Sequence, residues 1–380
     1  MPQTSIKKFP FIDALRGIAI LGVILYHSSL SVAPKNQILL WFMRQGALGV
    51  QLFFVISSLT LFLSWKARST HEISPTRNFF IRRFFRIAPM FYLAIIAYIL
   101  INGFSPSFWA PNGVKWWFIP ITAAFLHGFH PETHTAVVPG GWAIAVEMNF
   151  YLIVPFLIPH IKTLKFCLLL FIISVIFAAL NLFIVPHIFP YSEYQHLKVF
   201  IYASFFNQLP VFILGLFCYL IFSKNYPRKN IAIIGGLIFL LLFLALLFPV
   251  FKLPNNFIAK NLLIRPHHIF AGGLFSVFTL MLANWPIGLL VNRFTTTLGK
   301  LSYSMYLTHF AILTYFSKLG FSAMFPRSNI ASLLHFLCVV LISAFVSFFL
   351  YKLVEKTGIK IGRRLIEKLE KKNRGRCQGF

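Results

Sequence analysis

Long apolar segments recur along almost the whole chain and constrain its fold more than any other feature. Each has about 18–25 residues, enough for a helix to cross the ~30 Å hydrocarbon core of a lipid bilayer. They cover residues 12–30, 46–65, 84–101, 142–160, 165–186, 199–222, 230–251, 268–291, 301–319 and 331–353. With 58% hydrophobic and 11% charged residues, the chain has no stretch suited to a separate soluble domain. We therefore predict an all-α polytopic membrane protein with about ten transmembrane helices.

The basic residues predict how these helices are oriented. The chain has 35 lysines and arginines against 8 acidic residues, which gives a formal charge of +27. Most of the basic residues fall in alternate connecting segments and in the C-terminal tail, as the positive-inside rule requires if both termini are cytoplasmic. Because membrane topology explains the charge, we expect no nucleic-acid partner. A further apolar segment, 115–127, is too short to span, so we expect it to be re-entrant or interfacial.

Two regions follow from this pattern. We expect residues 1–353 to form an integral membrane domain. In residues 354–380, basic residues alternate with apolar ones. This alternation predicts a basic amphipathic cytoplasmic tail, lying on the anionic surface of the membrane.

Neither the cysteines nor a cluster of histidines predicts a metal site. The four cysteines are scattered, and three of them fall in apolar segments. His127, His130 and His134 are spaced like ligands on a helix, but Pro131 interrupts that helix. We therefore expect no metal and no disulfide, and a loop surface role for the histidines.

The first apolar segment carries the ionisable residues Asp13, Arg16 and His27. Arg16 and His27 are eleven residues apart, which on a helix is only ~20° past three full turns. They therefore share one stripe, about 16 Å apart along the axis, and Asp13 lies close to the same stripe. Ionisable side chains inside a membrane helix are costly and usually functional, so this stripe is the first candidate site.

Two further sets of charged residues belong to the candidate site. Glu147 lies inside the segment 142–160, at a depth where it could meet His27 or pair with Arg16. Arg82, Arg83 and Arg86 begin the segment 84–101, and their planar guanidinium groups suit a polyphosphate ligand. Each set also has a structural explanation: a buried ion pair for Glu147, and lipid headgroups or membrane topology for the arginines.

Five stretches together resemble one known family, the acyltransferase 3 family of membrane-bound O-acyltransferases. The first combines Asp13-Ala14-Leu15-Arg16-Gly17 with Tyr26-His27, and the second is Gly49-Val50-Gln51-Leu52-Phe53-Phe54-Val55-Ile56-Ser57-Ser58. The others are Arg82-Arg83-Phe84-Phe85-Arg86-Ile87-Ala88-Pro89, the run from Trp142 through Glu147 and Tyr151 to Pro155, and Leu298-Gly299-Lys300-Leu301-Ser302-Tyr303-Ser304-Met305-Tyr306-Leu307-Thr308-His309. Gln51 and Ser58 depart from the family pattern, in which an acid and a glycine are usual. The stretches occur in family order.

The resemblance implies a reaction. A family member of this type takes an acyl group, most often acetyl, from cytoplasmic acyl-CoA, which is a co-substrate rather than a bound cofactor. The acceptor is a hydroxyl of an extracytoplasmic or lipid-linked carbohydrate, such as lipopolysaccharide O-antigen or another surface polysaccharide. The resemblance also implies an integral protein of the bacterial cytoplasmic (inner) membrane.

The same resemblance suggests a role for each candidate residue. His27 would be the general base, because the unperturbed pKa of histidine lies near neutrality. Arg16 would guide the donor or neutralise negative charge, and Glu147 and Asp13 would orient the network. Arg82, Arg83 and Arg86 would hold the phosphates of acyl-CoA. Tyr303, His309 and Ser57 would contact these groups and hold them in position. Helix packing alone also explains a serine or a lone histidine there.

A proton-coupled transporter or flippase is the alternative function. Buried histidine, glutamate and arginine residues also form proton relays across membranes. Transporters usually show inverted internal repeats with broken helices in matching places. We find no such repeat in this sequence, so the acyltransferase hypothesis is preferred.

Overall fold

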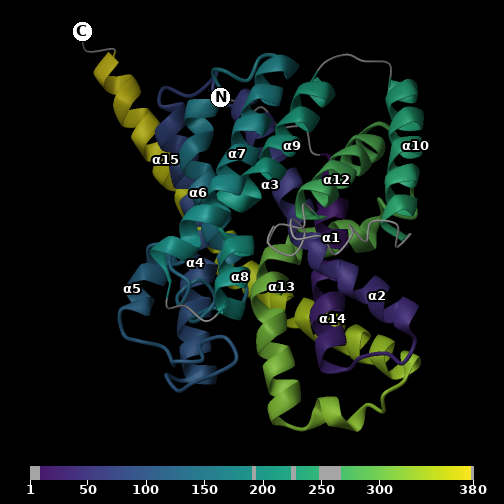
Figure 1. The fold of residues 1–380 in the computed structure, drawn as a ribbon. Coiled ribbons are helices and arrows are strands. Elements are labelled where there is room, and N and C mark those ends of the chain that lie inside the picture. The colour runs from purple at the N-terminus through teal and green to yellow at the C-terminus, as the bar shows by residue number, and fades with distance from the viewer. Residues whose placement is uncertain (1–8, 191–193, 224–227, 248–266, 378–380) are drawn as a thin grey trace.

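The computed structural model describes residues 9–190, 194–223, 228–247 and 267–377, and within these ranges the chain is a bundle of helices (Figure 1). The only strand-type pairing in the described ranges is an isolated bridge between Ser107 and Ala110. The first helices are α1 (Pro10–Ser31), α2 (Gln37–Gln45), α3 (Gly49–Lys66), α4 (Pro75–Asn102), α5 (Phe118–Ala123), α6 (Gly141–Leu157) and α7 (Leu164–Ile188). They are followed by α8 (Tyr194–Ala203), α9 (Phe205–Ser223), α10 (Arg228–Leu247), α12 (His267–Asn284), α13 (Arg293–Lys318), α14 (Asn329–Leu350) and α15 (Lys356–Cys377).

Seven helical segments in the described part of the chain are long and apolar enough to cross a membrane. They are Pro10–Ser31, Gln37–Lys66, Pro75–Asn102, Leu164–Ile188, His196–Ser223, His267–Asn284 and Asn329–Arg374, and α6 is apolar but shorter. The prediction of an all-α membrane protein is therefore confirmed. The number of ten spans and the cytoplasmic position of both termini stay predictions. Within the segment 115–127 the only α-helix is the six-residue α5, which is too short to span.

Local sequence explains where several helices begin and end. Asn292 caps α13 by accepting from Thr295 N, while the Thr295 hydroxyl accepts from Asn292 N. The Ser328 hydroxyl similarly accepts from Ala331 N at the start of α14. The predicted segment 268–291 is wrong at its end, because α12 stops at Asn284, two residues before Pro286, which cannot continue the helical hydrogen bonds. Residues 248–251 of the predicted segment 230–251 lie outside the described residues.

Helices α1 and α13 run side by side in the same direction and approach each other very closely. A Cβ atom added to Gly299 would lie 1.7 Å from the carbonyl oxygen of Asp13, and one added to Gly17 would lie 2.1 Å from that of Thr295. Only glycine permits such backbone contact between membrane helices. This contact aligns Arg16 on α1 with the polar face of α13, and it places His27 beside His309.

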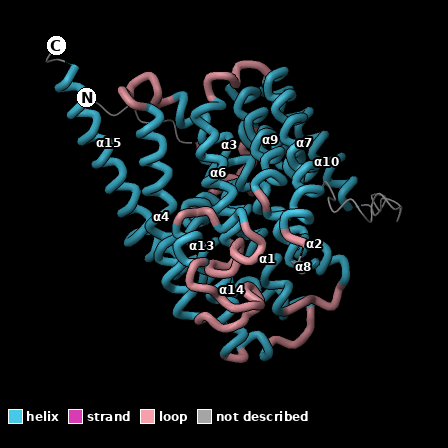
Figure 2. Tube along the Cα trace, turned by 60° about the vertical axis from the view of Figure 1, so that its left-hand side comes forward, coloured by secondary structure: helices cyan, strands magenta, loops and turns pink. Residues whose placement is uncertain are grey.

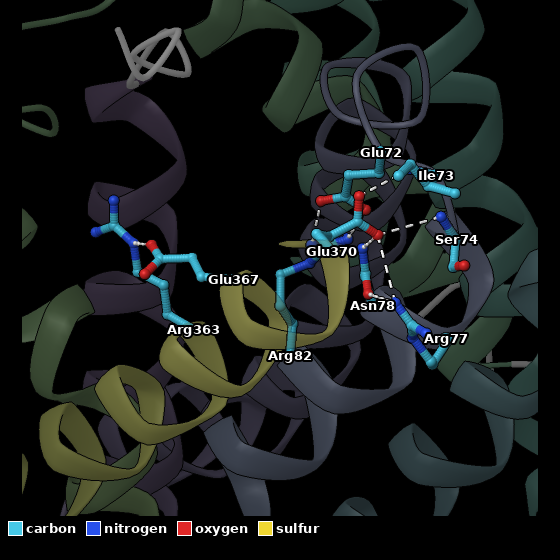
Figure 3. Close-up of polar contacts among 9 residues, drawn as sticks. All are labelled: Glu72, Ile73, Ser74, Arg77, Asn78, Arg82, Arg363, Glu367 and Glu370. Atoms are coloured by element: carbon cyan, nitrogen blue, oxygen red, sulfur yellow. Dashed lines mark hydrogen bonds and ion pairs between the residues drawn. The ribbon is translucent and has the colours of Figure 1, made fainter. Parts of the chain in front are cut away.

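A π-turn, Tyr351–Glu355, joins α14 to α15, so the helix continues past the predicted boundary between membrane domain and tail. α15 lies along the first half of α4 and extends beyond the other helices (Figures 1 and 2). Glu370 on α15 accepts hydrogen bonds from the backbone N–H groups of Ile73 and Ser74 and from the side chain of Asn78 (Figure 3). We call the side where α15 ends and α4 begins the terminal side, and the opposite side, with the loops around α5, the loop side.

Candidate active site

A cavity of about 70 Å³ lies between α1, α3, α4, α6 and α13. Its polar lining is almost entirely made of residues that the sequence analysis singled out or their neighbours: Arg16, Ser57, Thr60, Arg83, Arg86, Glu147, Tyr151, Ser302, Tyr303 and Tyr306. The five resemblance stretches, distant in sequence, thus meet around one space.

Arg83 and Arg86 lie one turn apart on α4 and both line this cavity. Arg83 is 9% exposed, and its guanidinium lies over the rings of Phe79 and Tyr151, at 5.6 and 5.7 Å from their centroids. Among the described residues, neither Arg83 nor Arg86 has a carboxylate within ion-pair distance. Burying the charge of Arg83 without a paired carboxylate is costly, whereas Arg86 is half-buried and attracted by the nearby Glu355. Together the two guanidinium groups are suited to binding an anion.

Arg82 points elsewhere, about 100° around α4 from Arg83, although it lies only about 40° from Arg86. Its guanidinium forms an ion pair with Glu72, which lies in the loop before α4, and donates to both carboxylate oxygens (Figure 3). It is absent from the cavity wall. Of the three arginines in the predicted phosphate-binding cluster, the structure therefore brings Arg83 and Arg86 together with the other candidates and holds Arg82 in a contact between the loop and α4.

Arg16 on α1 and Glu147 on α6 line the same cavity. Arg16 donates to the hydroxyl of Thr60 at 3.3 Å and lies 3.7 Å from the carboxylate of Asp13. Glu147 accepts a short hydrogen bond from Ser57 and another, at 2.5 Å, from the hydroxyl of Tyr151. Two donors thus fix the orientation of the Glu147 carboxylate. Glu147 shares its surroundings with the arginines, and the structure shows no contact between it and His27.

His27 forms a separate cluster with His309 nearer the loop side. The two imidazole rings are 5.4 Å apart, and the ring of Phe310 is 4.4 Å from that of His27. His309 is fully buried, and its Nδ1 lies 3.1 Å from the carbonyl oxygen of Met305. A carbonyl can only accept, so Nδ1 carries the proton and Nε2, which has no partner, presents a lone pair.

Tyr306 connects the cavity with the histidine pair. It lines the cavity, and its ring lies 5.8 Å from that of His309. Its hydroxyl donates to the carbonyl of Gly140 at 2.9 Å. Gly140 has φ +73°, and a Cβ atom there would lie 2.7 Å from the Phe310 ring, so the turn before α6 requires glycine. Tyr306 therefore contacts both the arginine cavity and the histidine pair.

The sequence analysis missed Glu355, which the structure places against the cavity. Glu355 ends the π-turn, is 3% exposed and accepts a hydrogen bond from Ser304 at 3.0 Å. On the sequence it resembles any acid of a charged tail. Its burial depends on the π-turn, for which the residues give no signal. Tyr303, predicted as a supporting residue, donates to the carbonyl of Ile87 at 2.8 Å and lines the cavity.

Comparison with known proteins identifies relatives that are named as O-acetyltransferases. The O-acetyltransferase OatA of Staphylococcus aureus (strain NCTC 8325 / PS 47) is 24% identical over 402 residues, which cover 97% of this chain and 60% of the relative. The peptidoglycan O-acetyltransferase OatA of Listeria monocytogenes (strain ATCC BAA-679 / EGD-e) is 29% identical over 180 residues, covering 42% of this chain and 26% of the relative. A provisionally named O-acetyltransferase of Staphylococcus aureus (strain COL) is 26% identical over 352 residues.

That match covers 82% of this chain and 52% of the Staphylococcus aureus (strain COL) protein, so the chain spans about half the length of the curated relatives it matches. No solved structure matches the chain significantly. The model of the acyltransferase domain family matches residues 9–352 and so includes every helix that lines the arginine cavity. The chain is a member of this acyltransferase family.

Proposed function

We propose that this protein is an O-acyltransferase that moves an acyl group, most simply acetyl, from acyl-CoA to a hydroxyl of a carbohydrate. The observation that carries the proposal is the buried Arg83 and half-buried Arg86 in one cavity, whose wall includes Tyr306, a ring neighbour of His309. One relative is named for acetylation of peptidoglycan, which favours a cell-surface glycan as acceptor. Lipopolysaccharide, another surface polysaccharide or a lipid-linked glycan would suit the same chemistry. The bacterial cytoplasmic membrane is the expected location.

Acyl-CoA would enter from the terminal side, which we take as cytoplasmic. Arg83 and Arg86 would bind its phosphates, because a guanidinium pairs with phosphate through two parallel hydrogen bonds. Arg16, on the facing helix, would neutralise remaining negative charge near the pantetheine arm. Ser57 and Tyr151 donate hydrogen bonds to Glu147. Its negative charge would reduce the repulsion between the arginines when no donor is bound. Because its carboxylate is already hydrogen-bonded, it would compete only weakly with the donor's phosphates for the arginines.

The transfer itself would require one base and good positioning, because a thioester is already activated. His27 would take the proton of the acceptor hydroxyl while the oxygen attacks the thioester carbonyl. The new carbon–oxygen bond would form, the carbon–sulfur bond would break, and the CoA thiolate would leave and take up a proton. His309, whose Nε2 presents a lone pair, would orient His27 and help stabilise its protonated form.

Release of free thiol from acetyl-CoA by the purified protein in detergent, with a crude envelope glycan added, tests this proposal. We expect release by the wild type and by His160→Ala, whose imidazole lies at the exposed end of α6. His27→Ala should abolish release while leaving the thermal unfolding of the protein unchanged. Turnover by His27→Ala at the wild-type rate would exclude the assigned base. No release by the wild type would instead favour the proton-coupled transporter.

A further inference from the structure

A second cavity, of about 380 Å³, lies on the loop side, away from the arginines. The loop between α4 and α5 contributes Trp109 and Asn112 to its wall, and the loop before α6 contributes His130 and Glu132. The end of α7 and the start of α8 close the opposite side with Phe189 and its neighbours. The wall therefore combines aromatic rings with hydrogen-bonding groups.

The polar groups of this loop-side cavity are held in place but remain accessible. Glu132 accepts from Lys115 Nζ at 2.9 Å and from Asn112 Nδ2 at 3.3 Å, yet its side chain is 33% exposed. The hydrogen bond from Lys115 lowers the pKa of Glu132, which keeps the group a carboxylate. A carboxylate with two oxygens has acceptor capacity left for ligand hydroxyls. His130 is fixed between the rings of Trp117 and Phe189, at 5.5 and 5.3 Å.

Two successive ring contacts connect the aromatic wall of the loop-side cavity with His27. The indole of Trp109 packs edge-on against the ring of Phe310 at 5.3 Å, and Phe310 packs against His27 at 4.4 Å. The arginine cavity reaches the same pair through Tyr306, from the terminal side. His27 and His309 thus lie between two cavities of different chemistry, one cationic and one aromatic with a carboxylate.

We propose that the loop-side cavity is the acceptor subsite and that it binds a pyranose ring of a glycan chain. A pyranose has a face of C–H groups that packs against an indole and an edge of hydroxyls that donate to carboxylate and amide oxygens. Trp109 supplies the first kind of surface, and Glu132 with Asn112 supplies the second. A sugar there would present one hydroxyl past Phe310 toward His27. This inference rests on the proposed function, because it places the acceptor of that reaction.

Binding of the tetramer of N-acetylglucosamine to the full-length protein in detergent, without acetyl-CoA, tests the subsite. Trp109→Ala and Glu132→Gln should each weaken binding about ten-fold or more, as expected when a central aromatic or charged contact is removed. Trp109→Phe keeps an aromatic ring and should recover most of the affinity. Trp116→Ala is the matched control, because Trp116 is 78% exposed and lies outside the cavity wall. Arg83→Met should bind the tetramer as the wild type does.

The kinetic assay separates this inference from the proposed function. In transfer to the tetramer, Trp109→Ala and Glu132→Gln should raise KM for the glycan while KM for acetyl-CoA stays at the wild-type value. Wild-type affinity for the tetramer in both variants, or no binding by the wild type at millimolar tetramer, would overturn the subsite. Thiol release from acetyl-CoA with the crude envelope glycan would still stand in either case. Loss of thiol release in wild type and variants alike would refute the reaction instead.

Discussion

Replacement of Arg83 with methionine should leave the protein as stable as before or more stable, although Arg83 lies in the middle of the site. The guanidinium is 9% exposed and has no carboxylate at ion-pair distance among the described residues. Removing an unpaired charge from water costs several kcal/mol, and its contacts with Phe79 and Tyr151 return only about 1–2 kcal/mol together. Methionine fills similar space without charge. We expect the free energy of unfolding to be unchanged or about 1–2 kcal/mol higher.

The same replacement should weaken the binding of acetyl-CoA. A hydrogen bond between a charged donor and phosphate contributes about 1.5–3 kcal/mol, so the Kd for acetyl-CoA should rise about 10- to 150-fold. Calorimetric titration of the protein in detergent measures this Kd, and chemical or thermal unfolding of the same preparation measures stability. Opposite changes in the two quantities are typical of a residue retained for function at the expense of stability.

Arg82→Met is the matched control for this prediction. Arg82 is adjacent in sequence but forms its ion pair with Glu72, outside the cavity. Its replacement leaves Glu72 without a partner and should therefore lower stability, while the Kd for acetyl-CoA stays the same. A large loss of affinity in Arg82→Met with none in Arg83→Met would refute the assignment of the donor site. A marked loss of stability in Arg83→Met would refute the argument about its unpaired charge.

Two further predictions concern the helices and loops that position the site. Gly299→Ala should destabilise the protein by more than about 2 kcal/mol in thermal unfolding, because the new Cβ atom would overlap the backbone of Asp13. Gly273→Ala is the control and should not destabilise the protein, because no atom lies within 4 Å of a Cβ atom there. Equal stability of the two variants would contradict the close α1–α13 contact. Burial lowers the pKa of His127 to about 4, below its unfolded value near 6.5, so the folded state binds fewer protons and stability should fall as the pH drops from 7 toward 4. The loss at pH 5 should be about 1–2 kcal/mol, and His127→Gln, which can still donate to Gly141, should show a shallower pH dependence of unfolding.

Much of the fold follows from the sequence, because apolar length and helix periodicity are local properties. Seven of the ten predicted apolar segments coincide with helices long and apolar enough to span a membrane, and the motif order predicted a family that comparison has confirmed. Helix geometry also predicts that Arg16 and His27 share one stripe. In the structure, however, Arg16 lines the arginine cavity, whereas His27 packs against His309. Two residues on one stripe therefore lie in different parts of the candidate site.

Other features depended on contacts that no single segment contains. Depth along the helix predicts that Glu147 meets His27 or Arg16, but the rotation of α6 turns it toward Ser57 on α3. The rotation of α4 decides that Arg83, rather than Arg82, lines the cavity with Arg86. The π-turn buries Glu355, and the cavity beside Trp109 exists only because loops from three parts of the chain meet.

The sequence by itself therefore determined that the chain crosses a membrane as helices, that it belongs to an acyltransferase family, and which residues carry the candidate chemistry. These conclusions depend on composition, spacing and residue type, which are fixed along the chain. Only the tertiary structure decided which of those residues face one another and that two cavities lie on either side of His27 and His309. Helix rotation, close glycine contacts and loop packing set those relations, and they arise from the whole bundle.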